Sequence, residues 1–173
     1  MIKLIDILNE IGDSSAQKYD WRFKGKYDTG DVINIDYEFK TDSDTQYFVK
    51  LTVQESPSTS SAFEMMVAFG VGKSIIKKAF GDKKPFAQVV NKGELYRVMA
   101  TVIDIVKDGI EKMAQDDYPV KIILFKPEQE KETATGFKIT DQRAKLYMAY
   151  IKQNMDMVNN VRQKGKEIEV ILK

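Results

Sequence analysis

The sequence predicts a single α+β domain over residues 1–173, in which a mostly antiparallel sheet is followed by a β-α-β-α-β arrangement. Three observations lead to this fold class. Apolar and polar residues alternate with a period of two in the first half of the chain, which is typical of strands with one buried face. After residue 91, apolar residues recur at helical spacing instead. An unbroken apolar run, residues 120–125, then indicates a strand buried on both faces.

The composition restricts the chemistry that is open to the chain. Its 27 lysine and arginine residues nearly balance its 26 aspartate and glutamate residues, so no overall field attracts nucleic acid or anionic lipid. The chain contains neither cysteine nor histidine. Disulfides, thiolate nucleophiles, sulfur-ligated metals and histidine-based catalysis are therefore excluded, and no metal site is expected.

The sequence also predicts where the protein works. The apolar N-terminal segment carries Lys3 and Asp6, which differs from the uncharged core of a signal peptide. No run approaches the roughly 20 apolar residues of a membrane span. We therefore expect a soluble, cytoplasmic protein without a membrane partner.

A short helix and an edge strand are the first elements expected. Residues 1–12 show helical spacing of apolar residues, with Gly12 as the stop signal. Around Trp21, aromatic side chains alternate with polar ones, which favours an edge strand near residues 19–24.

Antiparallel strands are expected to fill residues 32–90. The first two runs alternate clearly and are joined by a five-residue polar loop, which predicts an antiparallel hairpin. One or two helical turns are expected within residues 74–80. The expected strands are 32–39, 46–53, 62–69 and 86–90.

Residues 91–173 are expected to run helix, strand, helix, strand. Asn91 and Glu94 match a capping box at the start of a long helix, and Gly109 weakens its last turns. In the apolar strand that follows, Ile122 and Leu124 are expected to be fully buried. The expected ranges are 91–115 and 140–154 for the helices, and 120–125 and 167–172 for the strands.

Closely spaced lysines follow the third expected strand. Neighbouring ammonium groups release counterions together on a phosphate backbone, so the segment is a candidate surface for nucleic acid or an acidic protein. The alternative is a lysine-rich turn that is merely solvated. The candidate partner-binding residues are Lys73, Lys77, Lys78, Lys83 and Lys84, together with Trp21.

The segment Gly70–Ser74 has the composition of a phosphate-binding loop. That loop requires a further glycine at the position that Val67 occupies. A tight turn that uses glycine for its geometry is therefore the interpretation adopted.

Two other groups of side chains allow a functional and a structural interpretation. The carboxylates of Asp36, Glu38 and Glu64 lie on expected strands and would serve acid-base chemistry or magnesium if they met, although exposed strand faces carry such residues routinely. Trp21 with Tyr19, Phe23 and Tyr27 forms either a stacking platform for bases or a packing anchor.

The element order over residues 86–172 resembles the C-terminal half of the GNAT acetyltransferase fold. Residues 142–147 resemble the family's segment that ends in a Leu-Tyr pair, which implies that Tyr147 protonates the coenzyme A thiolate. Lys92 and Gly93 lie where the family's pyrophosphate loop precedes the long helix, which implies acetyl-coenzyme A as the cofactor. The chain departs from that loop pattern, because it has a single glycine there and an acidic residue after it.

Residues 96–106, followed by an apolar strand and the segment 143–147, resemble small uncharacterised proteins of tailed bacteriophages. The resemblance covers about half of the chain. It implies a phage origin and a place in the infected bacterial cell, and it implies no activity.

The sequence favours a protein that binds a host or phage macromolecule, protein or nucleic acid, without turnover and without a cofactor. The alternative is a GNAT-like acyltransferase that uses acetyl-coenzyme A through an atypical loop. A structural virion component is a third hypothesis, and it predicts a large self-complementary apolar patch.

Overall fold

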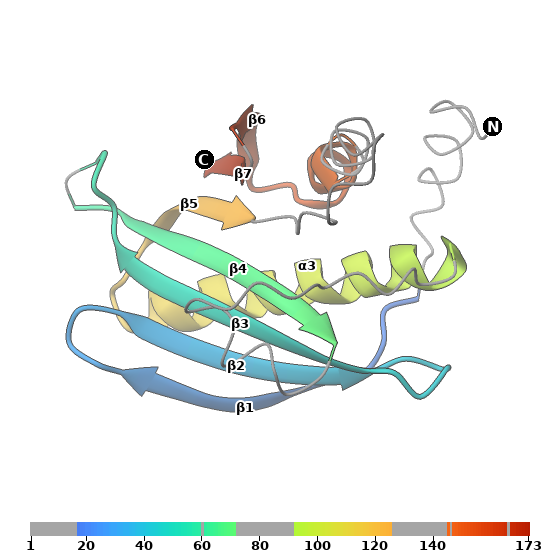
Figure 1. Ribbon diagram of the computed structural model, residues 1–173. Coiled ribbons are helices and arrows are strands. Elements are labelled where there is room, and N and C mark those ends of the chain that lie inside the picture. The colour runs from blue at the N-terminus through green and yellow to red at the C-terminus, as the bar shows by residue number, and fades with distance from the viewer. Residues whose placement is uncertain (1–16, 60, 72–91, 126–144, 146, 166) are drawn as a thin grey trace.

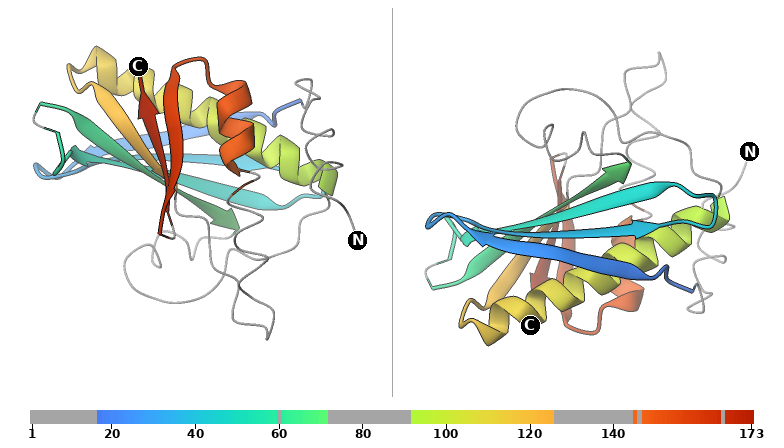
Figure 2. Two further views of the ribbon diagram at one scale, coloured as in Figure 1. Left: turned by 90° about the horizontal axis from the view of Figure 1, so that it is seen from above. Right: turned by 90° about the horizontal axis from the view of Figure 1, so that it is seen from below.

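The computed structural model describes residues 17–59, 61–71, 92–125, 145, 147–165 and 167–173. These residues form a seven-stranded sheet with the strand order β1-β2-β3-β4-β5-β7-β6, and helix α3 (Lys92–Gln115) lies across one face of it (Figures 1 and 2). Neighbouring strands are antiparallel except β4 and β5, which are parallel. The predicted α+β class with a mostly antiparallel sheet is therefore confirmed.

The strands of the first half follow the predicted order. The hairpin of β2 and β3 is antiparallel, with Ile35 opposite Leu51, as predicted. The strand bounds are β1 Trp21–Asp28, β2 Ile33–Lys40, β3 Gln46–Glu55, β4 Phe63–Val71, β5 Val120–Phe125, β6 Val158–Lys164 and β7 Glu167–Leu172.

Alternation along each strand separates a core face from an outer face, which is the face of the sheet opposite α3. On β2, Ile35 and Tyr37 point to the core face and are almost completely buried. Asp36 lies between them on the outer face and is only partly buried. The period-two pattern in the sequence thus identifies the core face correctly.

Helix α3 covers the core face, and its bounds agree with the predicted helix. Its apolar side is buried at Val98, Val102, Ile105 and Val106. Gly109 lies on this side, where a Cβ atom would overlap Leu51 Cδ1 of β3. Glycine therefore permits a close approach of the helix to the sheet, in addition to its cost in helix propensity.

We expect Gly109→Ala to lower the free energy of unfolding by about 1–3 kcal/mol, because overpacking outweighs the better helix propensity of alanine. Urea denaturation measures the change. Glu111→Ala, at an exposed position of the same helix, is the control and should change stability by no more than about 0.5 kcal/mol. A stabilised Gly109→Ala protein would show that Leu51 moves aside easily.

Strand β5 is at its predicted place, but only one of its faces is fully buried. Ile123 and Phe125 point to the core face and are 0% and 4% exposed. Ile122 and Leu124 point to the outer face and are half-buried. The prediction that both are fully buried is therefore wrong, because an apolar run does not by itself require packing on both faces.

The sequence did not predict strand β6. Its polar residues leave Val161 as the one side chain of the strand that is buried in the core. The strand forms an edge of the sheet, beside β7, and Gly165 after it has φ +64°, as a tight hairpin turn requires. The edge position explains why the strand lacks an apolar pattern.

Residues 147–154 are helical, and the helix ends near Asn154 as predicted. Ile151 and Met155 are buried there, and Lys107 of α3 donates to the Asn154 carbonyl at 2.9 Å. Three predicted elements lie outside the residues that the structure describes, namely the helix at 1–12, the turns at 74–80 and the strand at 86–90.

Candidate functional site

Trp21, a predicted partner-binding residue, connects the sheet to α3. Its Nε1 donates to Asp104 Oδ2 at 2.7 Å, and its ring meets the Tyr37 ring edge-on with a centroid distance of 5.4 Å. Trp21 is half-buried by these contacts. The packing-anchor interpretation describes this residue better than a stacking platform does.

The aromatic residues of β1 do not share one face. Trp21 and Phe23 are paired with core-face residues of β2, but a bulge between Phe23 and Gly25 shifts the register. Tyr27 is consequently opposite Asn34 and lies on the outer face. The predicted platform of four aromatic side chains is therefore divided between two sides of the sheet.

The residues implied by the acetyltransferase resemblance lie on two helices. Lys92 and Gly93 are the first two residues of α3. Tyr147 belongs to the helical residues 147–154, and its ring meets the Phe69 ring edge-on with a centroid distance of 6.2 Å. The lysines of the predicted basic segment, residues 73–84, lie outside the described residues, so that surface stays a prediction.

A row of polar residues on α3 holds β1 and β2 in place. Thr101 accepts a hydrogen bond from the Tyr19 backbone N–H at 2.8 Å, and Asp108 accepts one from the Tyr37 hydroxyl at 2.6 Å. Burial, together with the bond to Asp108, raises the pKa of Tyr37 well above its ordinary value. Tyr37 is thus a permanent hydrogen-bond donor of the fold.

Asp104 belongs to the same row and is held as a carboxylate. Burial alone would raise its pKa, but hydrogen bonds from Lys18 and Trp21 and the charges of Lys18 and Lys107 outweigh burial, so its pKa is lowered. A lowered pKa in the folded state stabilises the fold above the pKa of the unfolded chain. That contribution disappears as the pH falls through the folded-state value.

We expect Asp104→Asn to cost about 1–2 kcal/mol of unfolding free energy at neutral pH, because two charge-assisted hydrogen bonds are weakened. The difference from the wild type should shrink as the pH falls below about 4, where the wild-type carboxylate takes up a proton. Urea denaturation at several pH values gives the stability difference at neutral pH and its change with pH. A constant difference at every pH would contradict the electrostatic origin.

The three carboxylates singled out in the sequence do not converge. Glu38 is held by Lys24 at 3.2 Å and by Arg22 at 3.7 Å. Glu64 is 7% exposed and accepts a hydrogen bond from Gln54 at 2.7 Å. Within the described ranges, no group of three or more acidic side chains is placed to hold a metal ion.

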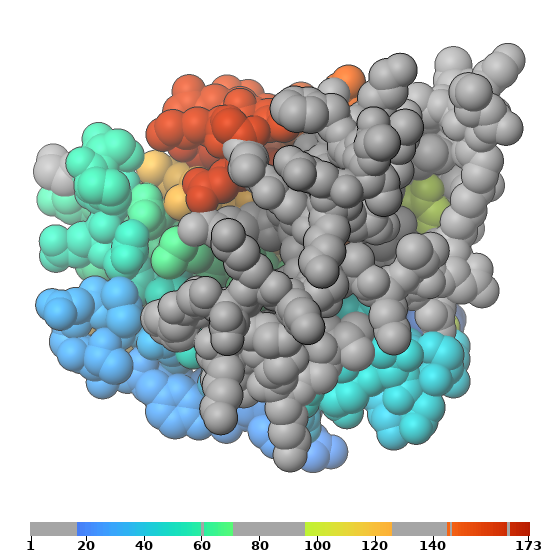
Figure 3. Space-filling view, in the orientation of Figure 1, coloured from blue at the N-terminus to red at the C-terminus, as the bar shows by residue number. Residues whose placement is uncertain are grey.

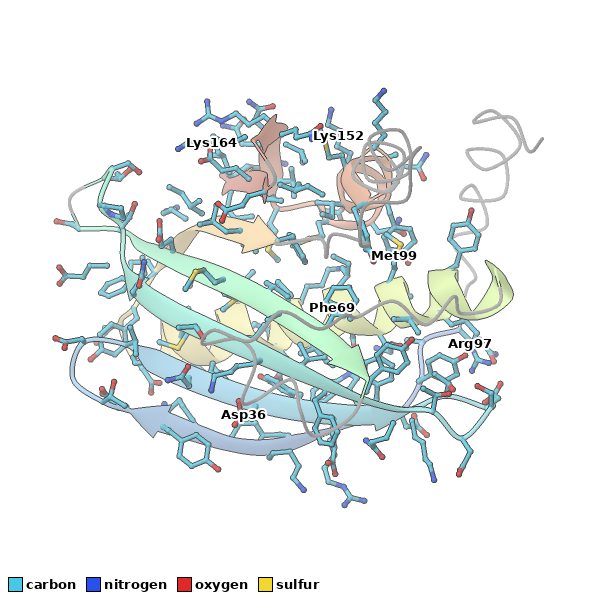
Figure 4. The ribbon with its side chains drawn as sticks, viewed as in Figure 1. Asp36, Phe69, Arg97, Met99, Lys152 and Lys164 are labelled. Carbon is cyan, nitrogen blue, oxygen red and sulfur yellow. The ribbon has the colours of Figure 1, made fainter. Side chains whose placement is uncertain are left out.

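The third carboxylate, Asp36, lines a pocket of about 200 Å³, here called the outer pocket. Three strands supply its lining: Lys24 and Tyr27 of β1, Asp36 and Tyr37 of β2, and Phe48, Val49 and Lys50 of β3. Asp36 is labelled in Figure 4, and residues of β1 and β2 (blue) reach the surface along the lower edge in Figure 3.

Strand register explains how the outer pocket forms. Asp36 is opposite Gly25 on one side and Lys50 on the other, so these residues form one row across the sheet. Tyr27 and Phe48 belong to the rows above and below, about 7 Å away along the strands. Gly25 has no side chain, and the Tyr27 ring lies over it, where a Cβ atom would be 2.7 Å from the Tyr27 hydroxyl oxygen.

The outer pocket combines exposed aromatic surface with charge. Tyr27 is 55% exposed, and Phe48 is half-buried. Lys24 and Lys50 also line the hollow, and the Lys24 ammonium group lies 3.2 Å from Glu38 Oε1. The Oδ1 atom of Asp36 is buried and has no hydrogen-bond partner among the residues that the structure describes. A buried acceptor without a donor costs about 1–3 kcal/mol, which a ligand donor can recover.

The comparisons with known proteins add no assignment to this geometry. No family model, no curated protein and no solved structure matched the chain. In the part of the chain that the structure describes, no helix is long and apolar enough to span a membrane.

Proposed function

We propose that this protein binds single-stranded nucleic acid, without turnover, on the outer face of β1, β2 and β3. The observation that carries the proposal is the outer pocket, where Tyr27 and Phe48 flank Asp36 and two lysines. Bases stack on aromatic rings irrespective of sequence, and ammonium groups neutralise the adjoining phosphates. Following the resemblance to tailed-phage proteins, we place this activity in the cytoplasm of an infected bacterium.

The two edge strands of the sheet have features that disfavour pairing with a further strand. These features support a partner that binds on the face of the sheet. β1 has a bulge between Phe23 and Gly25 and carries Lys24 and Lys26. β6, the other edge, has a register shift after Val158 and is rich in polar residues. Bulges and lysines are the features by which edge strands avoid pairing with other chains.

Fluorescence anisotropy with labelled single-stranded oligonucleotides of about 12 nucleotides tests the proposal. We expect binding that weakens steeply between about 50 mM and about 200 mM salt. Tyr27→Ala should weaken it by about 5- to 150-fold, because stacking contributes about 1–3 kcal/mol per base.

Phe23→Ala is the matched control for that experiment. Phe23 is 42% exposed on the same strand, but it lies on the core face and contacts Tyr37. Its loss should leave oligonucleotide affinity within about twofold, since no base reaches it. Equal losses of oligonucleotide affinity for Phe23→Ala and Tyr27→Ala would contradict a binding site on the outer face. Absence of any oligonucleotide binding would contradict the proposed function.

An acyltransferase is the second candidate, and the order of elements supports it. α3 leads to β5, and the helical residues 147–154 and strand β7 follow in the order that the resemblance implies. The sequence of the first turn of α3 opposes coenzyme binding, because it includes the acidic residue Glu94, whereas phosphates are attracted by the positive end of the helix dipole.

We therefore expect titration calorimetry to give no micromolar binding of acetyl-coenzyme A to the wild-type protein. Glu94→Gln removes the charge and serves as the comparison. Micromolar binding by the wild type would favour the acyltransferase and make Tyr147 the candidate general acid.

A further inference from the structure

We infer that the outer pocket recognises guanine within the bound strand, through the carboxylate of Asp36. The inference rests on the proposed binding of single-stranded nucleic acid and adds to it a preference for one base. It starts from the Oδ1 atom of Asp36, a buried acceptor for which the described part of the chain supplies no donor, in a pocket lined by aromatic residues and two lysines.

The chemistry of a carboxylate selects among the bases. A carboxylate only accepts hydrogen bonds, and its two oxygens bind best to two adjacent donors. Guanine presents such a pair, the N1–H and the N2 amino group. Adenine and cytosine present one amino group beside an acceptor, and thymine and uracil place carbonyl oxygens on both sides of one N–H. Guanine is therefore the base that satisfies both oxygens.

Asp36 is available for this role, whereas the neighbouring carboxylate is not. Glu38 lies on the same strand and face, but Lys24 and Arg22 occupy it at 3.2 Å and 3.7 Å. Asp36 has no ion pair of this kind among the described residues, and Gly25 opposite it carries no side chain that could approach the carboxylate. The pocket floor thus offers one acceptor group to a base.

Tyr27 lies beside Asp36, so its ring can stack on the same base that the Asp36 carboxylate recognises. A Cβ atom at Gly25 would lie 2.7 Å from the Tyr27 hydroxyl oxygen and 2.9 Å from its Cζ, so the phenol rests over Gly25, beside Asp36. Tyr27 is exposed, so rotation of its side chain is inexpensive. Rotation of the Tyr27 side chain opens the hollow above Gly25. A base then enters this hollow, and the displaced Tyr27 ring stacks on the base.

Oligothymidylate of about 12 nucleotides, with and without one central guanine, tests the inference by anisotropy. We expect one guanine to tighten wild-type binding about tenfold, as a bidentate base contact does. Inosine lacks the N2 amino group, and in place of guanine it should lose most of that gain. This comparison requires no change in the protein.

Asp36→Asn and Glu38→Gln form a matched pair of variants. Each removes one negative charge from the outer face, so each should raise affinity for oligothymidylate to a similar extent. Only Asp36→Asn should abolish the preference for guanine, because only Asp36 accepts from the base. Thermal melting confirms that both variants are folded.

The outcomes separate this inference from the proposed function. If oligothymidylate binds but guanine adds nothing, or if Glu38→Gln loses the preference as fully as Asp36→Asn does, guanine recognition is overturned and strand binding stands. If no oligonucleotide binds at all, strand binding and guanine recognition are both overturned. Loss of the preference in Asp36→Asn alone supports the inference.

Discussion

Ile123→Ala is expected to lower the free energy of unfolding by about 2–5 kcal/mol. Ile123 is 0% exposed and lies on β5, between Met65 of β4 and Val170 of β7, which are equally buried. Replacement by alanine removes buried methyl groups and leaves a cavity that the rigid sheet and α3 cannot close fully. Urea denaturation with a constant m-value measures the loss.

Leu124→Ala, one position further on the same strand, is the control. Leu124 is half-buried on the outer face, so its truncation removes less buried surface, and we expect a loss of about 1 kcal/mol. The ratio between the two variants is the critical result. Equal losses would mean that both faces of β5 are packed equally tightly, in conflict with the observed burial.

The elements that the sequence predicted well are those with local signals. The hairpin of β2 and β3 has two alternating strands and a short polar loop, and the sequence of α3 has a capping-box pattern at its start and a long apolar side. In each case the pattern that fixes the element lies within the element. Sequence reasoning therefore gave nearly correct bounds for these parts of the fold.

The burial of side chains on β5 and the formation of β6 depend on contacts with other elements, and a local sequence pattern does not reveal these contacts. The run Val120–Phe125 is apolar on both faces, but only contact with α3 decides which face is fully buried. β6 is recognisable as a strand only because it pairs with β7, with Val161 as its buried residue. Gly165 after a polar run was the available signal for this hairpin.

The outer pocket was only partly predictable, because a bulge places its residues. Simple alternation from Trp21 puts Tyr27 on the core face, but the shift between Phe23 and Gly25 moves it to the outer face. A glycine within an aromatic strand is a known sign of a bulge. Asp36 was singled out as one of three carboxylates, whereas the contribution of Phe48 depends on the pairing of β3 with β2.

Reversal of the two pocket lysines, Lys24→Glu with Lys50→Glu, is expected to weaken oligonucleotide binding by about 100-fold or more at low salt. Each lysine that meets a phosphate releases condensed counterions, and each contact adds about 0.7 to the slope of log affinity against log salt for single strands. The slope should therefore fall by about 1.4 in the double variant. Anisotropy titrations at several salt concentrations give affinity and slope together.

A charge-matched control distinguishes a local surface from a general effect of net charge. Lys152→Glu with Lys164→Glu changes the net charge equally, and both lysines are exposed at the end of the molecule away from Asp36 (Figure 4). We expect this variant to keep most of the affinity and the original slope. Equal effects of the two double reversals would contradict a binding site at the outer pocket.

The predicted basic segment is tested in the same series, because Lys77→Glu with Lys78→Glu changes the charge by the same amount. A loss of affinity comparable to that of the pocket variant would mean that the segment after β4 contacts the same strand of nucleic acid. The melting temperature should stay nearly unchanged in the pocket variant, since exposed pairs such as Lys24 with Glu38 contribute little to stability. A large drop in melting temperature would instead show that the lysines support the fold, and the loss of binding would then be secondary.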